Sequence, residues 1–361
     1  MREIALELKN VKKVFEKDGK KLIAVDSTSL EVEKGELVTF LGPSGCGKTT
    51  TLRMVAGFET PTSGTITFGG KDMTNVPVNK RGIGFVFQNY ALFPHMTIYN
   101  NVSYGLRARK EDEKTIKIKV NEALELVGLT GTENKYPNEL SGGEQQRVAL
   151  ARVIVMDPSL LLMDEPLSNL DAKLRIHMRT EIRRIQKQLG ITCLYVTHDQ
   201  AEALTVSDRI MVMSRGKVEQ IGTPQEIYSS PSSSFVADFI GDSNIIDGMM
   251  IKDKVVEILG VKIPCVDEGF GNNTPVDVVI RPEDIEIVAP DKGFMEGDIT
   301  SVIFKGVHYE IEIMANGFEW LVHTTLLHNV GEHVGINVIP FNIQIMNKPE
   351  SEDEEAVEID A

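Results

Sequence analysis

The segment GPSGCGKTT, residues 42–50, constrains the fold of this chain more than any other stretch. It directly follows LVTFL (37–41), which is typical of a short buried strand, and precedes a helical stretch that runs to about Ala56. A glycine-rich turn between strand and helix lets backbone N–H groups surround phosphate oxygens, and the helix N-terminus adds partial positive charge. The segment therefore predicts a phosphate-binding loop in an α/β domain.

Length and composition indicate two domains and exclude some classes of protein. The 361 residues are about twice the usual domain size, and 42% hydrophobic residues can form a sizeable core. With 38 Lys and Arg against 53 Asp and Glu, the net charge is −15, so we expect no nucleic-acid partner. Residues 348–361 are strongly acidic and are predicted to be a disordered tail.

The cysteines and the apolar runs bear on where the chain acts. Cys46, Cys193 and Cys265 are too scattered for a disulfide framework or a zinc site, which suits a reducing compartment. The start MREIALELKN lacks a basic stretch followed by an apolar one, so no signal peptide is expected. No run approaches 18 apolar residues, so we expect any membrane role to depend on a partner.

The predicted secondary-structure pattern changes near YSSPSSS (228–234). Before it, strand-like and helix-like stretches alternate, with further buried-strand candidates at 159–163 and 192–197 and a helix within 112–128. Beyond Ser243 the segments are short and β-rich, which predicts a small barrel or sandwich. We predict an α/β domain at 1–235 with a helical subdomain at about 90–155, a linker at 236–242, a β-rich domain at 243–347 and the acidic tail at 348–361.

Two further residues of the phosphate loop and an acidic pair predict the chemistry. Lys48 is expected to reach the β- and γ-phosphates of a nucleotide, and Thr49 to offer its hydroxyl to Mg²⁺. In LLLMDEP (160–166), an apolar strand delivers Asp164 and Glu165 to its carboxyl end, where α/β sheets bind ligands. Asp164 can hold Mg²⁺ through water, and Glu165 can orient or deprotonate an attacking water. Cys46 in the loop is either a redox sensor or a passive occupant.

The segment LSGGEQQR (140–147) predicts a second anion site. Ser141, Gly142 and Gly143 precede a helical stretch, so their backbone N–H groups form another positive helix N-terminus. One phosphate loop already serves one nucleotide. A second anion site in the same chain therefore suggests that two chains pair and enclose each nucleotide between them.

With these motifs in this order, residues 4 to about 240 resemble the nucleotide-binding subunits of ABC transporters. The resemblance implies that Phe15 stacks on adenine, although a core phenylalanine is the alternative. It implies that Gln88 in VFQNYALFP reaches Mg²⁺ and the attacking water, on a loop that senses the membrane partner. His198 in YVTHD would contact the γ-phosphate, and SNLD (168–171) would cross a dimer interface. Glu144 stands where many relatives carry Gln, and we expect little effect because the backbone donors remain.

The predicted site residues fall into three groups. The catalytic group is Glu165, His198 and Gln88, and the Mg²⁺ group is Thr49, Gln88 and Asp164. The residues expected to bind ATP are Phe15, Gly42, Pro43, Ser44, Gly45, Cys46, Gly47, Lys48, Thr49, Thr50, Ser141, Gly142, Gly143 and Asp171.

Several segments narrow the class of transporter. A fused exporter would carry a membrane span, and this sequence has no apolar run of that length. DNA-repair ATPases would carry long coiled-coil arms and a basic surface, and the sequence predicts neither. QNYALFPHMTIYNNVSYGL (88–106) resembles importer ATPases that also bear a regulatory domain, and VIRPEDIEI (279–287) resembles a signature of that oligonucleotide-fold-like domain. FIGDSNIIDG (239–248) and SVIFKGVHYEIEI (301–313) are most similar to the ATPases of spermidine/putrescine importers.

The resemblance implies a homodimeric, ATP-hydrolysing importer subunit on the cytoplasmic face of the membrane. It would drive two membrane permease subunits and, indirectly, an extracytoplasmic substrate-binding protein, for uptake of polyamines. A sugar or ferric-iron importer and a soluble regulatory ATPase remain alternatives. Oligonucleotide binding by the β-rich domain is disfavoured, because Lys and Arg are sparse between 276 and 345.

Overall fold

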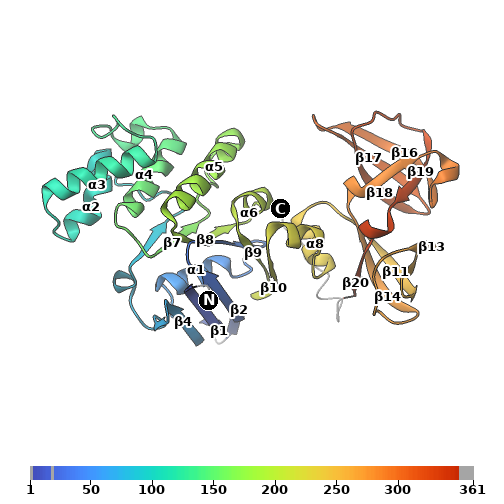
Figure 1. The fold of residues 1–361 in the computed structure, drawn as a ribbon, viewed down its shortest axis with the longest axis horizontal. Coiled ribbons are helices and arrows are strands. Elements are labelled where there is room, and N and C mark those ends of the chain that lie inside the picture. The colour runs from blue at the N-terminus through green and yellow to red at the C-terminus, as the bar shows by residue number, and fades with distance from the viewer. Residues whose placement is uncertain (1–2, 18–19, 349–361) are drawn as a thin grey trace. The chain divides into compact units, whose positions relative to one another are not determined.

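The computed structural model describes residues 3–17 and 20–348 and divides the chain into two compact units, Met1–Pro224 and Gln225–Ala361 (Figure 1). The strands of the first unit are β1 (Ile4–Lys17), β2 (Lys20–Glu33), β3 (Leu37–Leu41), β4 (Ser63–Phe68), β5 (Lys71–Asp72), β6 (Ile83–Val86), β7 (Leu160–Asp164), β8 (Thr192–Thr197), β9 (Arg209–Ser214) and β10 (Lys217–Gly222). Its helices are α1 (Lys48–Ala56), α2 (Ile98–Ala108), α3 (Glu113–Leu126), α4 (Gly142–Ile154), α5 (Ala172–Leu189) and α6 (Gln200–Val206).

A six-stranded sheet in the order β10-β9-β3-β8-β7-β6 forms the centre of the first unit. Its strands from β9 to β6 are parallel, so their carboxyl ends meet at one edge. Both faces are covered, which explains the continuous apolar runs of β3, β7 and β8. Within β7, Leu161 and Met163 belong to the core that contains residues of α2, α3, α4 and α5. Leu160 and Leu162 belong to the core that contains residues of α1.

The predicted elements around the phosphate loop are confirmed. The strand at 37–41 and the helix at 48–56 have the expected bounds, and the expected strand at 192–197 is β8. The helix expected within 112–128 is α3, which begins where the Asp112 side chain accepts a hydrogen bond from the Thr115 N–H. Its buried residues Ile116, Val120 and Leu124 recur at helical spacing and pack into the core of α2 and α4.

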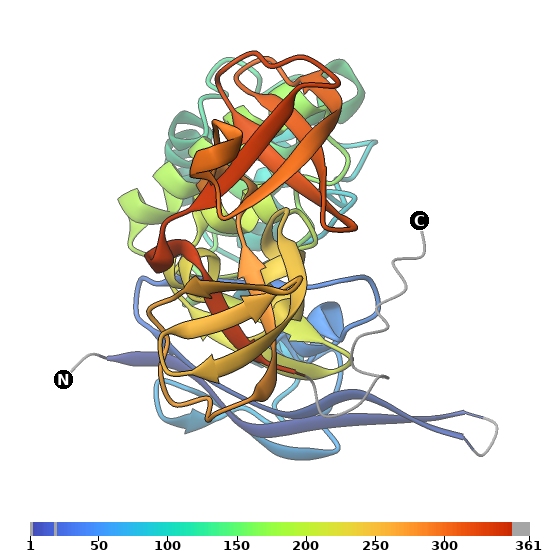
Figure 2. The ribbon, with the colours of Figure 1, turned by 90° about the vertical axis from the view of Figure 1, so that its right-hand side faces the viewer.

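A second sheet of the first unit, in the order β2-β1-β4-β5, is antiparallel. Its two longest strands, β1 and β2, form the blue ribbon in Figure 2 and pair along most of their length. No sequence motif predicted this sheet. It matters for the site because the Ala24 carbonyl of β2 approaches Gly47 in the phosphate loop.

The second unit is β-rich, as predicted. One five-stranded sheet has the order β13-β12-β11-β14-β20 and the other the order β15-β19-β16-β17-β18, and a shared core that includes the buried Trp320 joins residues of both. The strands, drawn in yellow to red in Figure 2, are β11 (Asn244–Lys252), β12 (Val255–Ile258), β13 (Val261–Pro264), β14 (Thr274–Ile280), β15 (Ile285–Val288), β16 (Met295–Phe304), β17 (Tyr309–Ala315), β18 (Phe318–Thr324), β19 (His333–Val338) and β20 (Gln344–Asn347).

Two short helices, α7 (Pro224–Ser229) and α8 (Ser234–Ile240), precede these sheets. The buried Arg281 guanidinium donates to the backbone carbonyls of Tyr228, Ala237 and Gly241 at 3.1, 2.8 and 2.8 Å. Residues 236–242, expected to form a linker, thus include the end of a helix that Arg281 binds. The predicted acidic tail lies almost entirely outside the described residues.

Candidate active site

The phosphate loop connects β3 to α1 and requires glycine at two places where other backbone comes close. A Cβ on Gly47, whose φ is 103°, would lie 2.4 Å from the Ala24 carbonyl oxygen. A Cβ on Gly42 would lie 2.2 Å from the Met213 carbonyl oxygen. Neighbouring strands thus hold the loop closely, so its backbone N–H groups are fixed at the N-terminus of α1, where an anion is favoured.

Lys48, the first residue of α1, is buried and turns its ammonium back over this loop. Its Nζ donates to the carbonyl oxygens of Gly42 and Pro43 at 2.6 and 2.8 Å, and Cys46 Sγ lies 3.6 Å away. The loop therefore carries a full positive charge besides the partial charge of the helix end. Burial raises the pKa of the Cys46 thiol, which keeps the sulfur protonated near neutral pH.

Thr49 and Asp164 meet beside the lysine. The Thr49 hydroxyl donates to Asp164 Oδ1 at 3.0 Å, which joins the start of α1 to the end of β7. Burial raises the pKa of the Asp164 carboxyl, and the hydrogen bond from Thr49 opposes that shift. Two oxygen donors that stand together at a phosphate loop are suited to a hard divalent cation.

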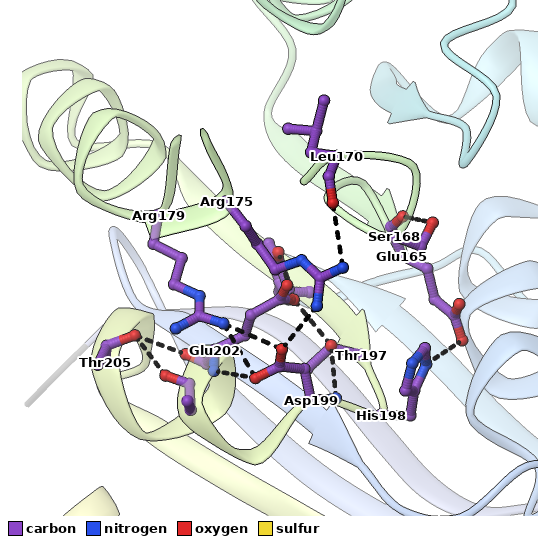
Figure 3. Close-up of polar contacts among 12 residues, drawn as sticks. Glu165, Ser168, Leu170, Arg175, Arg179, Thr197, His198, Asp199, Glu202 and Thr205 are labelled. Atoms are coloured by element: carbon purple, nitrogen blue, oxygen red, sulfur yellow. Dashed lines mark hydrogen bonds and ion pairs between the residues drawn. The ribbon is translucent and has the colours of Figure 1, made fainter. Parts of the chain in front are cut away.

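Glu165, one residue beyond β7, contacts the other two predicted catalytic residues. Its Oε1 lies 3.3 Å from His198 Nδ1 (Figure 3). Its Oε2 accepts from Gln88 Nε2 at 3.5 Å. Its backbone has φ 44°, a left-handed conformation that is uncommon outside glycine, and its N–H donates to the Val196 carbonyl at 3.0 Å. Backbone strain of this kind is typical of functional positions.

The loop that carries Gln88 is held from two directions. Tyr90 and Ala91 have φ of 60° and 48°, and their carbonyls accept from Arg152 of α4 at 3.0 and 2.7 Å. Asn169 Nδ2 donates to the Gln88 carbonyl at 2.9 Å. The position of Gln88 is therefore linked to α4 and to the loop at 168–171.

Ser141, Gly142 and Gly143 form the N-terminus of α4, as predicted from LSGGEQQR. Ser141 is the N-cap, and Glu144 accepts from the Ser141 N–H and hydroxyl at 2.8 and 2.7 Å. These hydrogen bonds lower the pKa of Glu144, which explains why a carboxylate is tolerated at this position. Within residues 3–17 and 20–348, no hydrogen bond or ion pair joins these three residues to the loop at 42–50.

Two predicted nucleotide contacts lie elsewhere on the unit. Phe15, on β1, is 37% exposed and pairs with Leu22 of β2, so it is not a core residue. Lys13 Nζ lies 4.9 Å from the centre of its ring. Asp171 is the N-cap of α5, and its carboxylate accepts from the Leu174 N–H at 2.9 Å.

A set of arginines on α5 lies beside the loop of His198 and was not among the predicted site residues. Arg175 and Arg179 both form ion pairs with Asp199, the residue after His198 (Figure 3). Arg183, one turn further along, pairs with Asp208. Arginines at every fourth position share one face of a helix, so this spacing was the available signal.

The fold and this constellation of residues define an ATP-binding cassette of the ABC transporter type. A family model described as ABC transporter matches residues 25–168. A spermidine/putrescine import ATP-binding protein PotA from Acetivibrio thermocellus is 52% identical over 351 residues, 97% of this chain and 99% of that protein. The protein of the same name from Clostridium novyi is 52% identical over 348 residues, 96% of this chain and 99% of that protein.

This chain belongs to the family of spermidine/putrescine import ATP-binding proteins. Among solved structures, it resembles the dimeric post-hydrolysis state of the ATP-binding cassette MJ0796 bound to ADP and Pi, with 31% identity, a TM-score of 0.54, and coverage of 61% of this chain and 98% of that one. The predicted ABC fold and ATPase activity are thereby confirmed. No helix in the described part of the chain has the length and apolar character to cross a membrane.

Proposed function

We propose that this chain is the motor subunit of a polyamine importer, which hydrolyses ATP between two copies of itself and drives uptake of spermidine and putrescine. The observation that carries the proposal is the contact of Glu165 with both Gln88 and His198 at the carboxyl edge of the sheet. The same edge presents the phosphate loop with Lys48. Relatives with this import function in their name match nearly the whole chain, which supports the substrate class.

In this proposal each group handles a different part of the reaction. The backbone of residues 42–50 and the Lys48 ammonium bind the β- and γ-phosphates. Glu165 orients or deprotonates the attacking water. Gln88 holds the same water, and His198 contacts the γ-phosphate. Phosphoryl transfer depends mainly on positioning and on charge stabilisation, which a cluster of fixed polar groups supplies.

Thr49, Asp164 and Gln88 are the residues that would hold Mg²⁺. The contact of 3.0 Å between Thr49 Oγ1 and Asp164 Oδ1 supports this assignment, because both are the hard oxygen donors that the ion prefers. When bound with ATP, Mg²⁺ neutralises charge on the β- and γ-phosphates.

The N-terminus of α4 supports a site made by two chains. Ser141 and its two glycines present an anion-binding helix end that, among the described residues, has no hydrogen bond or ion pair with the phosphate loop of its own chain. In a dimer, this helix end would face the nucleotide phosphates bound by the partner's phosphate loop. Phe15 would stack on adenine, and Asp171 would lie at the interface. The solved structure of the cassette MJ0796 bound to ADP and Pi is described as dimeric, which supports pairing of two chains.

A groove along α2 is the proposed docking site for the membrane permeases. It has a volume of about 500 Å³ and is lined by Met96, Asn100, Tyr104, Arg107 and Ala108. The buried Asn101 ties α2 to Phe93 through hydrogen bonds of 2.8 and 3.1 Å. Because Phe93 lies five residues after Gln88, a permease segment in this groove would act on the catalytic loop from the cytoplasmic face of the membrane.

The test is ATPase activity of the complex reconstituted in liposomes with its permeases and binding protein. We expect stimulation by spermidine or putrescine and none by maltodextrin or ferric ion. Stimulation by a sugar or by iron alone would overturn the substrate and leave the motor role intact. Failure to co-purify with any permease would favour the soluble regulatory ATPase.

A further inference from the structure

We propose that Arg175 is a positioning residue that fixes the interface loop, residues 168–171, against the loop of His198 in the same chain. Hydrolysis at one nucleotide site would then depend on an arginine of the opposite chain. This inference rests on the proposed two-chain site. It assigns a role to a residue that lies outside the phosphate loop, the acidic pair and the α4 N-terminus.

Arg175 is suited to this role because its two terminal nitrogens bind different loops. Nη2 donates to the Leu170 carbonyl in the interface loop at 3.1 Å, and Nη1 donates to Asp199 Oδ2 at 3.2 Å (Figure 3). The planar guanidinium holds its donors in a fixed geometry, so both acceptors are held relative to each other. Among the described residues, no other side chain donates to both Leu170 and Asp199.

Asp199 is in turn fixed to the loop of His198. Its N–H donates to Thr197 Oγ1 at 3.0 Å, and its Oδ1 accepts from the Glu202 N–H at 2.8 Å, which caps α6. His198 lies between Thr197 and Asp199, so its backbone has little freedom. A displacement of Leu170 is therefore transmitted through Arg175 to the segment that carries His198.

Arg179 provides a matched control one turn away on α5. Its Nη2 donates to Asp199 Oδ1 and Oδ2 at 3.1 and 3.0 Å, and no hydrogen bond from Arg179 to the interface loop is found in the described part of the chain. Replacement of either arginine by glutamine removes an ion pair with Asp199. Only replacement of Arg175 removes the link to Leu170.

The experiment mixes two full-length chains, one with Ser141→Arg and one with Lys48→Ala. In a heterodimer both defects fall in one site, and the intact site combines the phosphate loop and His198 of the first chain with the α4 N-terminus and interface loop of the second. Arg175→Gln, Arg175→Lys or Arg179→Gln is then added to the second chain only. The recovered ATPase activity is measured, together with the melting temperature and MgATP binding of each chain.

We expect Arg175→Gln in the second chain to lower the recovered activity about tenfold, because small errors in placement cost catalysis heavily. Arg179→Gln in the same chain should lower the recovered activity less than about twofold. The two variants lose a similar ion pair and should melt at similar temperatures. Arg175→Lys keeps the charge but cannot hold both acceptors, so it should behave as Arg175→Gln does.

Each other outcome has a distinct meaning. Equal effects of Arg175→Gln and Arg179→Gln would overturn the positioning role, as would full activity with Arg175→Lys. If the mixture without these changes recovers no activity, the two-chain site itself is wrong, and the inference falls with it.

Discussion

Arginines that bind backbone carbonyls act differently in the two units of this chain. In the first unit, Arg152 binds backbone carbonyls of the loop that carries Gln88. Arg175 binds a backbone carbonyl of the loop at 168–171, which contacts the Gln88 loop. In the second unit, Arg281 is 2% exposed and binds the backbone at 228–242, and its guanidinium lies 4.3 Å from the Tyr228 ring centre.

The surroundings of these arginines explain the difference. Near Arg152 and Arg175, Glu165, Tyr90 and Ala91 have left-handed backbone, and His198 leaves 56% of its side chain exposed. Strain and exposure reduce stability but keep side chains available for a ligand. Around Arg281 the polar contacts connect the end of α8 to the residue that follows β14. The comparison predicts that the first unit loses function and the second loses stability when its key residues change.

The largest expected effect is that of Glu165→Gln. The amide keeps the shape but cannot act as a base, so turnover should fall about 10²–10⁴-fold. MgATP binding should persist, and an ATP-dependent dimer should accumulate in gel filtration, with an unchanged melting temperature. Glu181→Gln, on α5, where the carboxylate pairs with Arg184, is the control for loss of a carboxylate. Turnover of Glu165→Gln at the wild-type rate would reject Glu165 as the hydrolytic residue.

Arg281→Ala should instead destabilise the second unit, by about 3 kcal/mol, because buried carbonyls lose charged donors. Hydrogen exchange should become faster across residues 225–348 while the first unit keeps its protection and its MgATP affinity. Lys262→Ala, on an exposed lysine of the same unit, is the control. Loss of MgATP binding with intact protection of the second unit would contradict the assignment of Arg281 as structural.

Sequence motifs predicted the local elements of the candidate site better than the distant contacts that support them. The residues from Gly42 to Thr50, the pair Asp164 and Glu165, and the Ser141 cap depend on local turn and helix-end chemistry, which short segments encode. The β1–β2 ribbon and the arginines of α5 depend on partners far away in the chain. An arginine on an amphipathic helix is usually solvated, and only the fold brings Asp199 to Arg175 and Arg179.

Lys48→Ala tests binding in the first unit separately from catalysis. Loss of a charge-assisted contact to phosphate should weaken MgATP binding by about 1.5–3 kcal/mol, which calorimetry can measure. Lys34→Ala, on a lysine whose side chain is 64% exposed, should leave the affinity unchanged. An unchanged MgATP affinity of Lys48→Ala would show that the Lys48 ammonium binds the loop carbonyls and not the phosphates.

The smallest effect concerns two cysteines, one in each unit. Burial raises the pKa of both Cys46 and Cys265, so below the raised pKa each is a thiol and little thiolate is present at neutral pH. Alkylation of the native chain by iodoacetamide should be slow at pH 7 and faster as the pH rises. MgATP should protect Cys46, which lies in the phosphate loop, and leave the rate at Cys265 unchanged. Mass spectrometry of the labelled peptides measures both rates.

Cys46→Ser should then retain ATPase activity within about twofold, as expected for a passive position. The serine preserves the size of the side chain, and the loop geometry depends on Gly42 and Gly47. Rapid labelling of Cys46 near pH 7, with loss of activity that mild reductant reverses after oxidation, would instead support a redox sensor. In that case the ammonium of Lys48, 3.6 Å from the sulfur, would outweigh the effect of burial on the thiol pKa.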